Sequence, residues 1–117
     1  MSYELAFLQA LLITVLLECF IAALLKKFFG RRLLLKQTYT RLLLTVALAS
    51  IITLPYAWFV LPAFVKSGIA YILLAEISVT IIEALFYWFT LKTSIKAAII
   101  LSVTANFFSW YIGNVVF

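Results

Sequence analysis

The sequence contains no histidine and only one cysteine, Cys19. Without histidine, one chain cannot assemble the familiar zinc or copper ligand sets, and it cannot ligate haem through histidine. A single cysteine excludes an intramolecular disulfide, so we interpret Cys19 as a small apolar core residue. We therefore predict no cofactor, while the sequence leaves open whether a metal ion binds to other side chains.

Charged residues are also scarce, at 11% of the 117 residues, whereas 68% are hydrophobic and the mean hydropathy is +1.23. Roughly a quarter of the residues of a soluble domain are charged, so this composition excludes that class. Four apolar stretches have the length of about 20 residues that crosses a membrane. They cover residues 5–25, 42–61, 69–89 and 97–116.

These stretches do not alternate polar and apolar residues as the strands of a membrane barrel do, and a lone apolar segment satisfies its backbone in the bilayer as a helix. We predict an all-α integral membrane protein, with residues 1–117 as one antiparallel bundle of four transmembrane helices. The first stretch resembles a signal peptide only in being apolar. Its first charge is the acidic Glu4 and no small-residue cleavage site precedes Lys26, so we expect a retained helix.

Positive charge is concentrated between the first two predicted helices. Six of the nine basic residues lie in this link, residues 26–41: Lys26, Lys27, Arg31, Arg32, Lys36 and Arg41. Lys92 and Lys96 flank the third link, and only Lys66 lies on the other side. By the positive-inside rule, both basic links face the cytoplasm and both chain termini lie outside. We expect a plasma membrane of the prokaryotic type.

The basic link interleaves its cations with apolar residues, among them Phe28 and Phe29. Such a segment can lie on the membrane surface, with its cations on anionic lipid headgroups. The positive-inside rule explains the basic residues that give the net charge of +5, because such residues stay on the cytoplasmic side of the membrane. No nucleic-acid partner is therefore predicted. The other links are short, which favours antiparallel neighbours, and Thr93 or Ser94 is the expected N-cap of the last helix.

Three glutamates, Glu18, Glu76 and Glu83, lie inside the apolar stretches, and those stretches contain no basic residue to pair with them. An ionisable group at membrane depth costs at least a few kcal/mol, so such residues usually mark an ion path, a proton relay or a ligand site. All of the available ligands are oxygen atoms, which suit protons and hard cations better than soft metals.

Polar residues of the third and fourth stretches recur at offsets of 0, 4, 7 and 11, which keeps each set on one helix face. The two sets are Glu76, Thr80, Glu83, Tyr87 and Ser102, Asn106, Ser109, Gly113. On antiparallel neighbours these stripes would face each other or a shared cavity. The alternative for the serine, threonine and glycine members is simple hydrogen bonding or close approach between helices.

Four polar residues, one from each helix, fall in a common layer. A helical rise of 1.5 Å per residue places them roughly 12 to 15 Å from the nearest basic residue on the cytoplasmic side. They are Glu18, Ser50, Glu83 and Asn106. Glu76 lies about 10 Å further out, near the bend expected at Pro55, which removes a helical hydrogen bond to the Ile51 carbonyl.

We therefore predict an exchangeable proton or cation site formed by Glu18 and Glu83, supported by Asn106 and Ser50, with Glu76 as an outer step. Thr80, Ser102 and Ser109 are further candidate site residues. The predicted function is proton- or cation-coupled transport or ion conduction. The alternative is an accessory subunit of a larger membrane complex, whose carboxyls pair with a partner's buried lysine or arginine.

An intramembrane enzyme is the third alternative, since a glutamate pair could do acid/base work. The sequence gives it little support, because it has no Gly-x-Ser-x-Gly, His-Glu-x-x-His or phosphate-binding glycine loop. The chain length, the four spans and the placement of Glu18 eight residues before Lys26 resemble the small multidrug resistance transporters. The resemblance covers little more than this segment and implies a proton- and substrate-binding role for Glu18 in a dimer. Two further glutamates in the third span depart from that pattern, and a homo-oligomer is expected because four helices leave only a narrow path.

Overall fold

The computed structural model describes residues 2–33, 35–65 and 68–116, with side-chain surroundings as far as Gly113. The elements are α1 (Tyr3–Phe29), α2 (Tyr39–Pro55), the π-helix η1 (Tyr56–Val60), the 3₁₀-helix η2 (Leu61–Ala63), α3 (Ile69–Leu91) and α4 (Ile95–Val116). Over these ranges the chain contains no strand. Four of its helical segments are long and apolar enough to cross a membrane, which confirms the predicted all-helical class and the prediction of four helices of this length and composition.

The first link is shorter than the predicted residues 26–41, because both adjoining helices extend into it. The N–H of Gly30 bonds to the Lys26 carbonyl at 3.0 Å, so α1 continues through the basic pair to Phe29. Thr38 caps α2 by accepting a hydrogen bond from the Arg41 N–H at 3.2 Å. Helix capping therefore sets the ends of the link, which apolar run length alone does not define.

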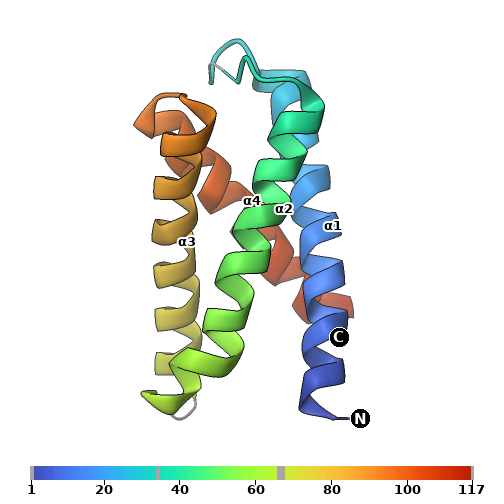
Figure 1. Cartoon of the computed structure of the whole chain (residues 1–117), viewed down its shortest axis with the longest axis vertical. Helices are drawn as coiled ribbons and strands as arrows, with labels where there is room; N and C mark the ends of the chain where they lie inside the picture. The colour runs from blue at the N-terminus through green and yellow to red at the C-terminus, as the bar shows by residue number, and fades with distance from the viewer. Residues whose placement is uncertain (1, 34, 66–67, 117) are drawn as a thin grey trace.

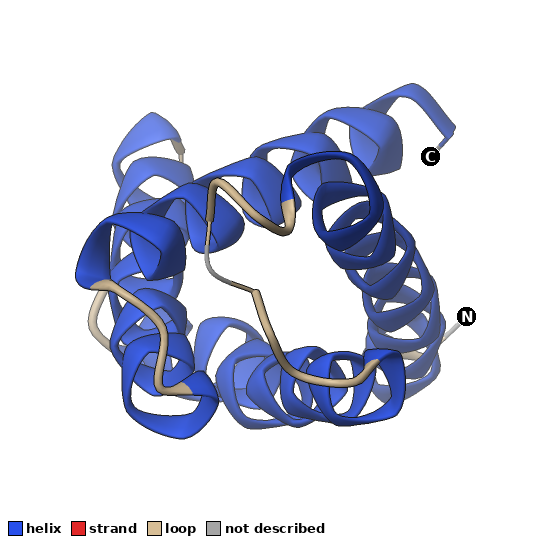
Figure 2. Ribbon diagram, turned by 90° about the horizontal axis from the view of Figure 1, so that it is seen from above, coloured by secondary structure: helices blue, strands red, loops and turns tan. Residues whose placement is uncertain are grey.

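The helices form a closed ring (Figures 1 and 2). α1 packs against α2 and α4, and α3 packs against the same two helices, so that α1 and α3 lie opposite each other. Both chain termini lie at one end, which we call the terminal end (Figure 1). The α1–α2 and α3–α4 links lie at the other, which we call the basic end. Lys66, the one basic residue expected on the terminal side, lies outside the described residues.

Regular α-helix in the second span ends at Pro55, where a distortion was expected, and a π-helix follows. A π-helical turn breaks the regular ladder and exposes backbone carbonyls that need other donors within a membrane. Two tyrosine hydroxyls supply them. Tyr71 of α3 donates to the Ala57 carbonyl at 2.5 Å, and Tyr3 of α1 donates to the Trp58 carbonyl at 2.5 Å. These two hydrogen bonds therefore connect the π-helix η1 to α3 and to α1.

Tyr71→Phe removes only the hydroxyl that satisfies the Ala57 carbonyl, so we expect it to destabilise the fold by about 1 to 3 kcal/mol. Thermal unfolding in detergent, followed by tryptophan fluorescence, measures the effect. Tyr111→Phe is the matched control, because that ring is exposed on α4. Equal melting temperatures for Tyr71→Phe and the wild type would contradict the role assigned to this hydrogen bond.

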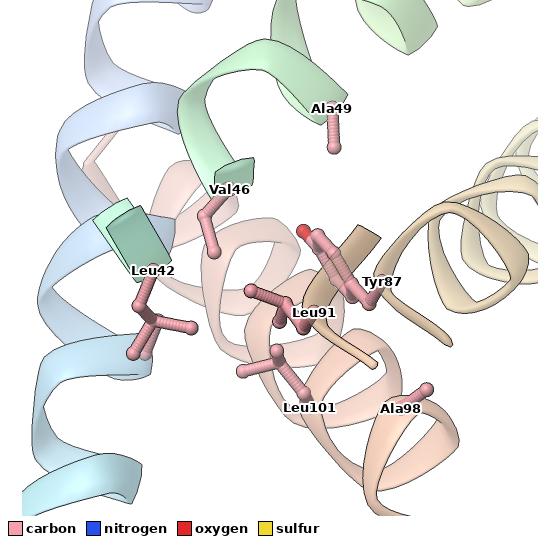
Figure 3. Packing of buried hydrophobic residues seen from close by; sticks show 8 residues of the cluster. Leu42, Val46, Ala49, Tyr87, Leu91, Ala98 and Leu101 are labelled. Atoms are coloured by element: carbon pink, nitrogen blue, oxygen red, sulfur yellow. The ribbon is translucent and has the colours of Figure 1, made fainter. Parts of the chain in front are cut away.

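Apolar side chains form a buried cluster in the interior (Figure 3). By their places along the four helices, they lie between Glu18 and Glu83 on one side and the basic end on the other. We call this cluster the inner seal. It consists of Ala22, Leu42, Val46, Ala49, Tyr87, Leu91, Ala98 and Leu101. Hydrogen bonds also connect the α1–α2 link with the end of α3 and the α3–α4 link at the basic end. Thr93 donates to the Leu33 carbonyl at 3.0 Å, and Gln37 donates to the Leu91 carbonyl at 2.8 Å. Ser94 accepts from the Ala97 N–H at 3.1 Å, which confirms it as the N-cap of α4.

Candidate functional site

Glu18 and Glu83 meet in the interior of the ring. Only 2% of Glu18 and 1% of Glu83 is exposed, although they come from α1 and α3, which lie on opposite sides. Their carboxyl groups lie close to each other across the interior. Two carboxyls this close can share one proton or hold one cation between them.

Both oxygens of Glu83 accept hydrogen bonds from neutral donors on the two flanking helices. Asn106 Nδ2 of α4 donates to Oε1 at 2.6 Å, and Thr53 Oγ1 of α2 lies 2.8 Å from both Oε2 and the Ala49 carbonyl, between which it shares its one proton. The sequence placed Asn106 in this layer but did not single out Thr53. The available signal was its position three residues after Ser50, which puts both residues on neighbouring parts of one helix face.

Glu18 is surrounded differently from its partner. The Ser50 hydroxyl of α2 lies next to its carboxyl group. Even so, Glu18 Oε1 and Ser50 Oγ are buried without a hydrogen-bond partner among the described residues. Glu83 therefore has a donor on each oxygen, whereas Glu18 keeps an open position that an incoming proton or cation can use.

A cavity of about 420 Å³ extends from the carboxyl pair through the terminal half of the bundle. One water occupies about 30 Å³ of liquid, so the cavity has room for several waters or a hydrated ion. Its polar and aromatic lining consists of Thr14, Glu18, Thr53, Trp58, Tyr71, Glu76, Glu83, Asn106, Ser109 and Trp110. No residue of the inner seal lines it. The carboxyl pair therefore lies at the inner limit of the cavity, with the seal beyond it.

Glu76 lines the same cavity on the terminal side of the pair. It also borders a groove of about 370 Å³ on the outer surface between α3 and α4. Asn106 and Trp110 line both spaces. Glu76 thus stands in the wall between the interior cavity and the apolar outer surface, farther out than the carboxyl pair.

The remaining predicted site residues divide between the cavity and the helix contacts. Ser109 lines the cavity. Thr80 lines only the outer groove, and its carbonyl accepts a hydrogen bond from Ser102 Oγ at 2.7 Å. Asn106 Nδ2 also bonds to the Ser102 carbonyl at 2.9 Å. The Ser102 hydroxyl therefore joins α4 to α3 through the Thr80 backbone carbonyl, which is the alternative that the serine side chain allowed.

Basic residues surround a separate hollow of about 640 Å³ at the basic end. Its lining includes Lys26, Lys27, Arg31, Arg32 and Lys36 together with Phe28 and Phe29. Lys26 is partly fixed, because its Nζ donates to the Leu35 carbonyl at 2.8 Å and lies 5.2 Å from the centre of the Tyr39 ring. Arg41 is exposed on α2 and does not line this hollow.

The described part of the chain contains no group of three or more histidine, cysteine, aspartate or glutamate residues placed to hold a metal ion. What it does contain is a pair of carboxyls, a hydroxyl and an amide at the end of a cavity, and these can take up and release a proton or a weakly held hard cation. Comparisons of the chain with protein families, with curated proteins and with solved structures give no match.

Proposed function

We propose that this protein spans a membrane and exchanges a proton or hard cation at the Glu18–Glu83 pair, as part of proton- or cation-coupled transport or ion conduction. The observation that carries the proposal is the meeting of two buried carboxyls at the inner limit of a cavity large enough for water. Structural needs do not account for this pair, since an amide in place of either carboxyl would hydrogen-bond without the cost of an ionisable group.

The charge distribution supports an orientation for this path. With the basic end in the cytoplasm, both termini and the cavity face outside, as we propose for a prokaryotic plasma membrane. The ion then enters from the outside and reaches the carboxyl pair, while the inner seal blocks the cytoplasmic side. The basic hollow, with its aromatic neighbours, suits the phosphates of anionic lipid headgroups in the inner leaflet.

The surroundings of Glu83 favour a site completed within one chain over the accessory-subunit alternative. Thr53 and Asn106 already satisfy both of its oxygens, so a lysine or arginine from a partner is not needed there. A homo-oligomer remains part of the proposal, since four helices enclose only a narrow path. Light scattering on the purified protein determines its mass in solution.

Glu18→Gln and Glu83→Gln test the proposal in liposomes that contain the purified protein. We expect the wild type to move protons or cations down an imposed gradient, and each variant to fall to the rate of protein-free liposomes. Glu4→Gln is the matched control, because it makes the same change at an exposed position in the first turn of α1. Wild-type flux in both Glu18→Gln and Glu83→Gln would refute the proposal.

A further inference from the structure

Three buried polar atoms have no hydrogen-bond partner among the described residues. They are Glu18 Oε1, Ser50 Oγ and the Tyr87 hydroxyl. Each belongs to a different helix, and each side chain is at most 2% exposed. Buried polar groups in proteins are almost always satisfied, by protein or by ordered water, so three orphans in one small bundle call for a common explanation.

Two of these atoms lie next to each other at the carboxyl pair, and the third lies one helical turn from Glu83. The Ser50 hydroxyl lies beside the Glu18 carboxyl. Tyr87 follows Glu83 by one helical turn toward the basic end, and it interacts electrostatically with both glutamates. Tyr87 belongs to the same buried cluster as Ala49, the residue next to Ser50, and its hydroxyl points toward α2 (Figure 3). Unpaired oxygens from three helices therefore lie buried around the carboxyl pair.

We propose that Glu18, Ser50 and Tyr87 bind one buried water molecule, which serves as the inner proton carrier of the site. Buried waters typically make about three hydrogen bonds, the number that these atoms offer. Hard metal ions such as Mg²⁺ and Ca²⁺ take about six or more oxygen ligands, so three are too few for them. Serine and tyrosine hydroxyls can donate or accept, and the carboxylate accepts, so all three can be satisfied by water at once.

This inference rests on the proposed function and narrows its ion to a proton. When Glu18 is protonated, its O–H bond breaks as the water oxygen takes the proton, leaving a carboxylate and a hydronium ion. The hydronium has three O–H donors, which match the three oxygens as acceptors. The hydronium ion then gives up a proton to the Glu83 carboxylate, the other member of the pair, or returns it to Glu18, so no further reactant is required. Ser50 and Tyr87 act as positioning residues.

The other titratable side chains that face this region are Glu83 and Cys19. Glu83 is already held by Thr53 and Asn106, and the Cys19 thiol approaches the Leu43 carbonyl at 3.6 Å. The described part of the membrane spans contributes no lysine or arginine here. A hydronium ion at this position would therefore have only the carboxylates of Glu18 and Glu83 as charged neighbours.

Water–protein cross-peaks in NMR spectra of the purified full chain test the water site directly. We expect a long-lived water next to the Tyr87 ring and to Ser50, in sodium chloride and in choline chloride alike. Tyr87→Phe keeps the ring and removes the hydroxyl, so the contact should disappear. Tyr111→Phe, on the exposed face of α4, should keep it. Absence of the contact in the wild type, or its displacement by sodium, would overturn the inference.

Proton flux in liposomes separates this inference from the proposed function. We expect Tyr87→Phe and Ser50→Ala each to slow proton flux by roughly tenfold, the effect of one lost hydrogen bond to the carrier. Flux that requires Glu18 but proceeds normally in both variants would overturn the water carrier and leave the proposed function intact. A bound water in a wild-type protein that moves no ions would instead overturn the proposed function and leave the water site standing.

Discussion

Asn106→Leu is expected to destabilise the protein by about 2 to 4 kcal/mol, because a buried acceptor on a carboxyl loses its partner. The lost interaction is the 2.6 Å hydrogen bond to Glu83 Oε1. Leucine is close to asparagine in size, so the change removes the donor without leaving a large void. Unfolding in a denaturing detergent, followed by tryptophan fluorescence, measures the loss of free energy.

A double-mutant cycle with Glu83→Leu separates this pairing from other effects of the substitution. When both partners are apolar, no charged or polar group is left unsatisfied, so the double variant should be more stable than the sum of the single changes predicts. If Asn106→Leu lowers the free energy of unfolding by the same amount with Glu83 present and with Glu83→Leu, the hydrogen bond between the two side chains is not the cause of the loss.

Leu101→Ala is expected to weaken the inner seal. Leu101 is fully buried in that cluster, and truncation of a buried leucine to alanine typically costs about 2 to 5 kcal/mol through the cavity that it leaves. The new space lies within this cluster, between the carboxyl pair and the basic end. We therefore also expect the passive leak of protons through the protein, down an imposed gradient in liposomes, to increase.

Leu85→Ala is the control for this substitution, because it truncates a leucine that is exposed on α3. It should change neither the leak nor the stability by a comparable amount. If the Leu101→Ala variant leaked protons no faster than the wild type, the inner seal would not be the barrier between the carboxyl pair and the basic end.

The glutamate layer could be predicted from the sequence because helical rise and periodicity are fixed. Those two quantities placed Glu18, Glu83, Ser50 and Asn106 at one depth, and the structure brings these four together. The roles of Thr53 and Thr80 could not be predicted in the same way. Whether a polar residue beside the stripe faces the interior or the outer groove depends on the rotation and crossing of each helix, which side-chain packing determines.

The irregular end of the second span shows a similar limit. Pro55 predicted a break in the hydrogen-bond ladder, but the π-helix that follows and the tyrosines that satisfy its carbonyls depend on tertiary contacts. Tyr3 and Tyr71 reach it from 55 and 14 residues away in sequence. The ends of the link between α1 and α2 differed from the prediction for a local reason. The cap at Thr38 and the hydrogen bond of the Gly30 N–H extend these two helices beyond their apolar stretches.

The division of the carboxyl pair between two hairpins has a consequence for biogenesis. In the proposed membrane-spanning arrangement, Glu18 would enter the membrane with α1 before α3 and α4 have been synthesised, so at that stage it would have neither Glu83 beside it nor the completed ring around it. Glu83 gains its Asn106 partner only when α4 closes the ring. Chains that stop before α4 would carry two incompletely paired acids in the bilayer, which we expect to mark them for degradation by membrane quality-control proteases.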